Sequence, residues 1–94
     1  MTAPRTIRLI VTGRVQGVGY RFWAERMGRN LGLRGWVRNR ADGTVEILAT
    51  GADEAVSALV EACGIGPRAA TVAAVELADA ADDGSTGFAM APTA

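Results

Sequence analysis

The order of apolar and polar residues along the chain predicts a succession of strands and helices. Ile7, Leu9 and Val11 recur at every second position, which is the period of a strand with one face on a core. Over residues 21–31 the apolar spacing changes to every fourth position, which is typical of one side of a helix, and Gly32 follows as its C-terminal cap. The chain therefore begins with a strand followed by a helix.

The rest of the chain repeats the same two periods. Asp42-Gly43 is a strong hairpin-turn signal between two strand patterns. A loop is expected over 79–87, and the tail 91–94 is expected to fray. The remaining predicted elements are strands over 34–40 and 45–49, a helix over 53–63, a strand over 71–77 and a short strand over 88–90.

The order strand, helix, strand, strand, helix, strand predicts a fold of the α+β class. It is the ferredoxin-like split βαβ arrangement (βαββαβ), with two helices on one face of an antiparallel sheet. At 94 residues the chain is expected to form a single domain over 1–94, with the other face of the sheet more open. This fold serves many functions, so function has to be inferred from particular residues.

The most informative residues form a glycine-punctuated segment between the first strand and the first helix, reading Gly-Arg-Val-Gln-Gly-Val-Gly-Tyr-Arg over 13–21. Glycine adopts positive φ without strain, so successive backbone N–H groups can converge on one anion. The helix that follows adds free amides and the positive end of its dipole, and Arg21 adds a planar set of donors suited to phosphate. The segment predicts an anion-binding loop.

Two other glycine-rich loops do not fit this segment. A Walker-type loop needs a lysine after its last glycine, and the chain contains no lysine. A dinucleotide fingerprint that starts at Gly17 needs a third glycine at position 22, which is Phe22. A structural hairpin loop with one surface arginine remains the alternative interpretation of this segment by itself.

Composition narrows the chemistry further. The chain has no histidine and a single cysteine, Cys63, so the sequence predicts no metal site, no cofactor and no internal disulfide. Cys63 is followed by Arg68, but a Cys-x5-Arg phosphatase cradle needs five intervening residues and here there are four. Because Cys63 continues the apolar face of the second helix, we expect a small core side chain rather than a nucleophile.

Charge is divided unevenly along the chain, although the formal net charge is zero. Residues 1–47 hold nine arginines against three acids, a net charge of +6, and the remainder holds one arginine against seven acids, a net charge of −6. A positive half around the glycine-punctuated loop suits an anionic ligand, as would a solvated arginine-rich face. No apolar run approaches the roughly 18 residues of a membrane span, so no membrane partner is expected and a cytoplasmic protein is predicted.

Two blocks of the sequence resemble a known family. The loop resembles the G-x-V-Q-G-V-x-[FY]-R signature of acylphosphatases, and the resemblance extends to Gly-Trp-Val-Arg-Asn-Arg-Ala-Asp-Gly-Thr-Val-Glu over 35–46. Weaker similarity continues to Phe88, where the alanine-rich end departs from the family pattern. The resemblance implies a ferredoxin-like acylphosphatase that hydrolyses the carboxyl-phosphate anhydride of a small acyl phosphate without a cofactor.

The resemblance also assigns residues to the site. Arg21 matches the phosphate-binding catalytic arginine, and Asn39 matches the asparagine that orients the attacking water. The backbone amides of the loop would bind the phosphoryl oxygens, from Val15, Gln16, Gly17, Val18, Gly19 and Tyr20. The residue types agree with these roles, because asparagine is disfavoured inside a strand and its amide can both accept and donate hydrogen bonds. Alternatively, Asn39 only begins the hairpin turn.

Other function classes stay open at this point. A non-catalytic anion- or RNA-binding module would keep the same loop, and a regulatory domain acting on a protein partner is a third possibility. The strand pattern of RNA-recognition domains is absent from residues 44–48, so no nucleic acid is expected as a partner. The four aromatic residues near the basic half are expected to pack in the core and loop: Tyr20, Phe22, Trp23 and Trp36. A monomer is predicted.

Overall fold

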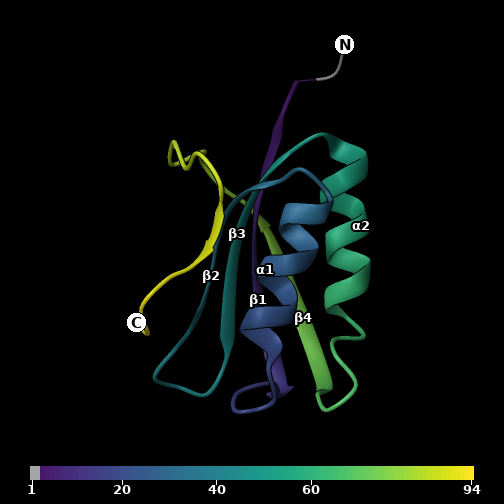
Figure 1. Cartoon of the computed structure of the whole chain (residues 1–94), viewed down its shortest axis with the longest axis vertical. Coiled ribbons are helices and arrows are strands. Elements are labelled where there is room, and N and C mark those ends of the chain that lie inside the picture. The colour runs from purple at the N-terminus through teal and green to yellow at the C-terminus, as the bar shows by residue number, and fades with distance from the viewer. Residues whose placement is uncertain (1–2) are drawn as a thin grey trace.

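The computed structural model describes residues 3–94, in which two helices cover one face of a five-stranded sheet (Figure 1). The order of the elements confirms the predicted α+β ferredoxin-like fold, and each predicted element is present. In chain order they are β1 (Arg5–Arg14), α1 (Tyr20–Asn30), β2 (Arg34–Asn39), β3 (Val45–Gly51), α2 (Asp53–Cys63), β4 (Thr71–Asp79) and β5 (Phe88–Met90).

The strands lie in the order β4-β1-β3-β2-β5. The predicted antiparallel pairing is confirmed for the first four strands, whereas β5 runs parallel to β2. This difference follows from the loop before β5, because β4 ends at the end of the sheet where β2 begins (Figure 1). A strand that starts there and extends the sheet beside β2 has to run in the same direction as β2.

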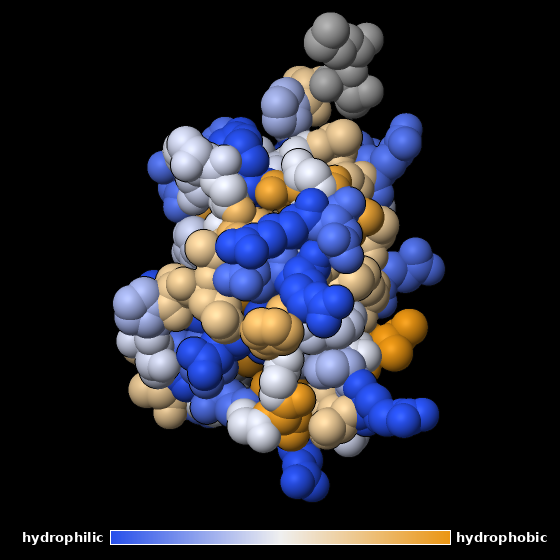
Figure 2. Space-filling model, in the orientation of Figure 1, coloured by the Kyte–Doolittle hydropathy of each residue, from blue (hydrophilic) through white to orange (hydrophobic). Residues whose placement is uncertain are grey.

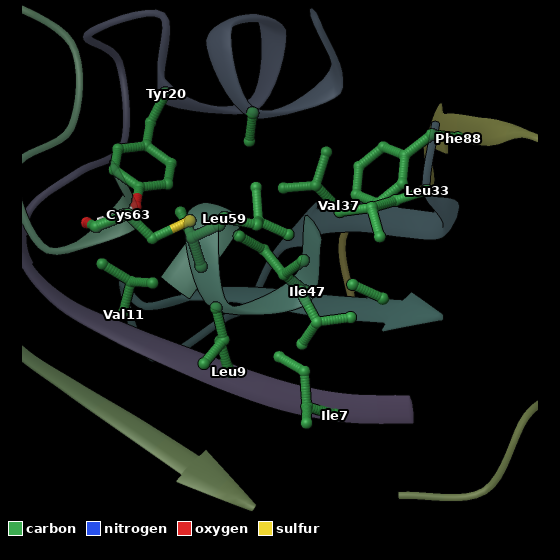
Figure 3. Close-up of a cluster of buried hydrophobic side chains, with 14 of the residues drawn as sticks. Ile7, Leu9, Val11, Tyr20, Leu33, Val37, Ile47, Leu59, Cys63 and Phe88 are labelled. Atoms are coloured by element: carbon green, nitrogen blue, oxygen red, sulfur yellow. Dashed lines mark hydrogen bonds between the residues drawn. The ribbon is translucent and has the colours of Figure 1, made fainter. Parts of the chain in front are cut away.

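The core lies between the sheet and the two helices (Figure 3). Alternate residues of β1 and β3 pair across the strands and are fully buried: Ile7 with Ala49, Leu9 with Ile47, and Val11 with Val45. The helices contribute Tyr20 and Ala24 from α1 and Val56, Leu59 and Cys63 from α2. The period of two in the strands and of about four in the helices therefore produces one continuous apolar layer.

Helix α1 packs closely on the β2–β5 edge of the sheet. A Cβ atom added at Gly28 would lie 2.6 Å from the Phe88 ring, so the close approach requires glycine. Two charged side chains of α1 bond the backbone of β5: Glu25 accepts from the Met90 amide at 3.0 Å, and Arg29 donates to the Phe88 carbonyl at 3.0 Å. These contacts fix the height of α1 along β2 and β5.

The face of the sheet opposite the helices is less open than expected. Glu46 is only 5% exposed, although it is charged and lies on this face. Its carboxylate accepts from the Arg38 guanidinium at 2.8 Å and lies 3.3 Å from that of Arg8, so both neighbouring strands are bridged through it. Because β3 is the middle strand, side chains from β1 and β2 cover it on this side as well.

The C-terminal tail does not fray as expected. Within the tail, Ala91 donates to the Val37 carbonyl and Ala94 donates to the Asn39 carbonyl, at 2.9 and 3.0 Å. These backbone bonds continue the pairing beyond β5, since residues 91–94 follow the same edge of β2. Within residues 3–94, neither helix is long and apolar enough to cross a membrane.

Candidate active site

The loop between β1 and α1 is held by its apolar residues and open at its glycines. Val15 and Tyr20 are 1% exposed and belong to the core, and Val18 packs against it. Gly17 and Gly19 between them have φ angles of +73° and +80°, which residues with a Cβ atom rarely adopt. The alternation of anchoring side chains and glycines turns the backbone of the loop outward.

The amide groups of this loop are free to bind a ligand. Within residues 3–94, the N–H groups of residues 16–20 donate to no backbone or side-chain acceptor. Gly19 is the N-cap of α1, and the first intrahelical bond is made only by Trp23, which donates to the Gly19 carbonyl at 3.0 Å. Several amides and the positive end of the α1 dipole therefore meet at one place, which is an arrangement that binds anions.

Gln16 joins the loop to the turn between β2 and β3. Its side-chain nitrogen donates to the Arg40 carbonyl at 2.8 Å and to the Thr44 carbonyl at 2.9 Å. The sequence predicts only a backbone role for Gln16, so the structure adds this side-chain contact. No local signal could have shown it, because the two carbonyls lie 24 and 28 residues further along the chain.

Arg21 is the second residue of α1 and is partly buried. Five arginines form ion pairs with carboxylates in the described part of the chain: Arg5, Arg8, Arg29, Arg34 and Arg38. Arg21 is not among them, so its guanidinium donors are not neutralised by a carboxylate in residues 3–94. It can therefore contribute a full positive charge to the loop.

Asn39 ends β2 on the same face of the sheet as the buried Val37, the face that α1 covers. Its backbone is paired with Val45 and accepts from Ala94, but its side-chain amide has no hydrogen-bond partner within residues 3–94. The amide is also not among the buried polar atoms without a partner, so it is open to solvent. A fixed strand thus presents a free amide.

The packing of α1 brings Arg21 level with Asn39. Glu25 bonds the amide of Met90, which lies opposite Val37 in the β2–β5 register. Helix α1 runs antiparallel to β2 (Figure 1), and four helical residues rise about 6 Å while two strand residues rise about 6.6 Å. Arg21, which lies four residues before Glu25, therefore reaches about the same height as Asn39, which lies two residues after Val37. Arg21 and Asn39 therefore lie at the same end of the sheet as the loop.

Cys63 belongs to the core, as the sequence predicts. Its side chain is fully buried, and this burial raises the pKa of the Cys63 thiol to about 11. A thiol with so high a pKa is almost entirely protonated near neutral pH and is a poor nucleophile. The Tyr20 hydroxyl donates to the Cys63 carbonyl at 2.8 Å, so the contact joins the end of the loop to the end of α2 (Figure 3).

Of the four aromatic residues expected to pack in the core and loop, two pack in the core, one packs outside it and one is exposed. Tyr20 is buried, and Trp23 packs against the core with its ring 5.2 Å from that of Tyr20. Trp36 is half-buried under the Arg38 guanidinium. Phe22, however, is 56% exposed at the start of α1. It lies on the side of the helix that turns away from the sheet, about half a turn from the buried Tyr20 and Ala24.

The fold and the loop place this protein in a class of small ferredoxin-like α+β proteins that have an anion-binding loop at the start of the first helix. A sequence model of the acylphosphatase family matches residues 7–90, and the chain belongs to this family. Its activity is the hydrolysis of the carboxyl-phosphate anhydride bond of acyl phosphates, which yields a carboxylate and inorganic phosphate.

Known acylphosphatases are similar to this protein along nearly its whole chain. An acylphosphatase of Azoarcus sp. (strain BH72) is 47% identical over 97% of this chain and 91% of its own length, and one of Azorhizobium caulinodans is 50% identical over 94% and 96%. The crystal structure of acylphosphatase from Bacillus subtilis matches with a TM-score of 0.89 at 37% identity, covering 95% of this chain and 99% of that one. These similarities favour the enzyme over a non-catalytic module with the same fold.

Proposed function

We propose that the loop amides of residues 15–20 and the guanidinium of Arg21 bind the phosphoryl group, and that the Asn39 amide orients the attacking water. The observation that carries this proposal is the set of free donors: unbonded loop amides, an arginine without a carboxylate partner, and a free strand amide at the same height. Such donors stabilise the charge that develops on the equatorial oxygens of a transferring phosphoryl group.

The reaction needs little more than this positioning. The water oxygen attacks phosphorus, the bond between phosphorus and the carboxyl oxygen breaks, and the electron pair of that bond leaves with the carboxylate. Because a carboxylic acid has a pKa of about 4, the leaving group departs without a proton. The proton of the attacking water passes to solvent or to the product phosphate. This chemistry suits a chain that has no histidine to act as a general acid.

Asn39 suits the water-orienting role because its side chain has both kinds of hydrogen-bonding group. The amide oxygen can accept from the attacking water, and the amide nitrogen can donate to the phosphoryl group that the water approaches. The strand backbone around Asn39 is bonded on both edges, to Val45 in β3 and to Ala94 in the tail. A rigid backbone keeps the amide in one position, which supports a role in orientation.

The first prediction concerns the activity of the parent protein. Purified protein is expected to hydrolyse acetyl phosphate and benzoyl phosphate at rates that excess chelator leaves unchanged, because the proposed site uses only protein donors. The aryl ester para-nitrophenyl phosphate is expected to react far more slowly, since its leaving group is poorer. The measurement is phosphate release with and without chelator. Hydrolysis that stops in chelator, or no hydrolysis above background, would contradict the proposal.

The second prediction concerns Gln16. Replacing it with alanine removes two hydrogen bonds between the loop and the β2–β3 turn, so the phosphoryl group and Asn39 are no longer held in one geometry. We expect Gln16→Ala to lower kcat/KM for acetyl phosphate about tenfold or more. Gln16→Glu should be at least as harmful, because a carboxylate cannot donate to the two carbonyls. Values of kcat/KM within twofold of the parent in both variants would exclude this role.

The same proposal includes the way the protein acts in the cell. We propose a single-domain monomer over 1–94 that works in the cytoplasm on a free small-molecule acyl phosphate, with no nucleic acid or membrane as a partner and no metal or cofactor. Cys63, the only cysteine, is a buried free thiol, which suits a reducing compartment. Sedimentation of the purified protein measures the oligomeric state directly.

A further inference from the structure

An aromatic side chain lies exposed in the first turn of α1, next along the chain to Arg21. Phe22 directly follows Arg21, and its side chain is 56% exposed. It is one of four large apolar side chains that are exposed in the described residues. The others are Ile65, Leu77 and Met90. Burial in the core does not explain the presence of Phe22, because neither the core cluster nor the side chains packed on it include this residue.

The position of the Phe22 ring follows from its place in α1. Side chains on a helix lean toward its N-terminus, so the ring lies over the first turn of α1, beside the loop. The guanidinium of Arg26, one turn later, lies over the ring at 5.9 Å from its centroid. Figure 2 shows apolar side chains in the lower part of the helical face, below the hydrophilic group over α1.

A shallow hollow opens beside this ring. It has a volume of about 280 Å³ and follows the outer side of α1, lined by Phe22, Trp23, Arg26, Met27 and Asn30. Its walls are mostly aromatic and apolar, with one amide and one guanidinium. A flat apolar group could lie in it with one face on the Phe22 ring, in the offset arrangement that aromatic pairs prefer.

The direction of the reaction leads to the same side of the helix. In phosphoryl transfer the attacking and leaving oxygens lie roughly in line, on opposite sides of phosphorus. Asn39, which would hold the water, belongs to the sheet layer, so the acyl group would leave on the side away from the sheet. On that side of the first turn of α1, the structure has Phe22, whereas Tyr20 and Ala24 point into the core.

We propose that Phe22 and the adjoining hollow form the acyl subsite, and that this subsite favours acyl phosphates with a flat apolar acyl group. The inference rests on the proposed function, because it takes the phosphoryl group to be bound by the loop and Arg21. Phe22 contributes to binding of the acyl group and not to the chemical step. The subsite therefore affects KM for large acyl groups and leaves small ones unaffected.

The experiment compares benzoyl phosphate with acetyl phosphate. In Phe22→Ala, we expect the ratio of kcat/KM for benzoyl over acetyl phosphate to fall about fivefold to tenfold through a higher KM for benzoyl phosphate. The values for acetyl phosphate and the inhibition constant of inorganic phosphate should stay within twofold of the parent. Phe22→Tyr keeps the ring and should keep the ratio, which separates loss of the aromatic face from a general disturbance of α1.

Two matched controls test the location of the subsite. Leu77 on β4 and Met90 on β5 are 44% and 45% exposed, so Leu77→Ala and Met90→Ala remove similar apolar surface elsewhere. Both are expected to keep the parent ratio. An unchanged ratio in Phe22→Ala, or an equal fall in Met90→Ala, would overturn the proposal while leaving the hydrolysis of acetyl phosphate intact. Absence of any hydrolysis by the parent would instead remove the proposed function, and this subsite with it.

Discussion

Arg21→Ala is expected to lower kcat/KM for acetyl phosphate by at least 10³-fold, which corresponds to about 4 kcal/mol of transition-state stabilisation. Arg21 is the arginine at the junction of the free-amide loop and α1, and no carboxylate in residues 3–94 pairs with it. Its loss removes charge where phosphoryl oxygens would bind. Affinity for inorganic phosphate should fall together with the rate, because the same donors hold substrate and product.

Arg21→Lys is expected to recover little of this loss. A lysine keeps the positive charge but cannot reproduce the planar, bidentate contact of a guanidinium with two phosphoryl oxygens. The matched control is Arg68→Ala, which removes an exposed arginine from the loop before β4 and should leave the rate unchanged. Steady-state kinetics and inhibition by inorganic phosphate measure both effects. An Arg21→Ala protein that binds phosphate as well as the parent would exclude Arg21 from the site.

Asn39→Ala is expected to lower kcat by at least about 10²-fold, on the order of 3 kcal/mol, while phosphate still binds. The variant keeps the loop amides and Arg21, so it loses the orientation of the water and not the binding of the anion. Asn39→Asp should also fail, because it places an anion in place of a donor beside an anionic substrate. These two variants separate the amide chemistry of Asn39 from its size.

The fold should tolerate both substitutions at Asn39. Its side-chain amide has no hydrogen-bond partner within residues 3–94, and the bonds to Val45 and Ala94 are made by the backbone. Removing the amide creates no core cavity, so the free energy of unfolding should change by less than about 1 kcal/mol. Turnover, phosphate binding and thermal unfolding are measured on the parent and both variants. A folded Asn39→Ala protein with normal turnover would contradict the water-orienting role, and lost turnover with unfolding would return Asn39 to a structural role in the turn.

Local sequence determined the elements of this fold and the loop between β1 and α1. The period of two around Leu9 and the change to a period near four after Arg21 are local features, because they depend only on which side of a strand or helix is buried. The loop was equally predictable from the sequence, since Gly17 and Gly19 adopt positive φ and the apolar residues Val15, Val18 and Tyr20 anchor it. Arg21 and Asn39 were identified by resemblance, and packing then brought them to the same height.

Tertiary structure decided the features that depend on distant partners. The direction of β5 follows from where β4 ends, and the order of the tail follows from backbone bonds to β2. The second role of Gln16 depends on carbonyls in a turn more than twenty residues away, and the exposure of Phe22 depends on which side of α1 meets the sheet. Contacts between distant segments do not change the hydrophobic pattern of either segment. They therefore cannot be predicted from the periodicity of the sequence. For this protein the sequence was therefore sufficient to predict the fold and the place of the glycine-punctuated loop, whereas only the packed structure joined that loop to the β2–β3 turn and left the ring of Phe22 exposed in the first turn of α1.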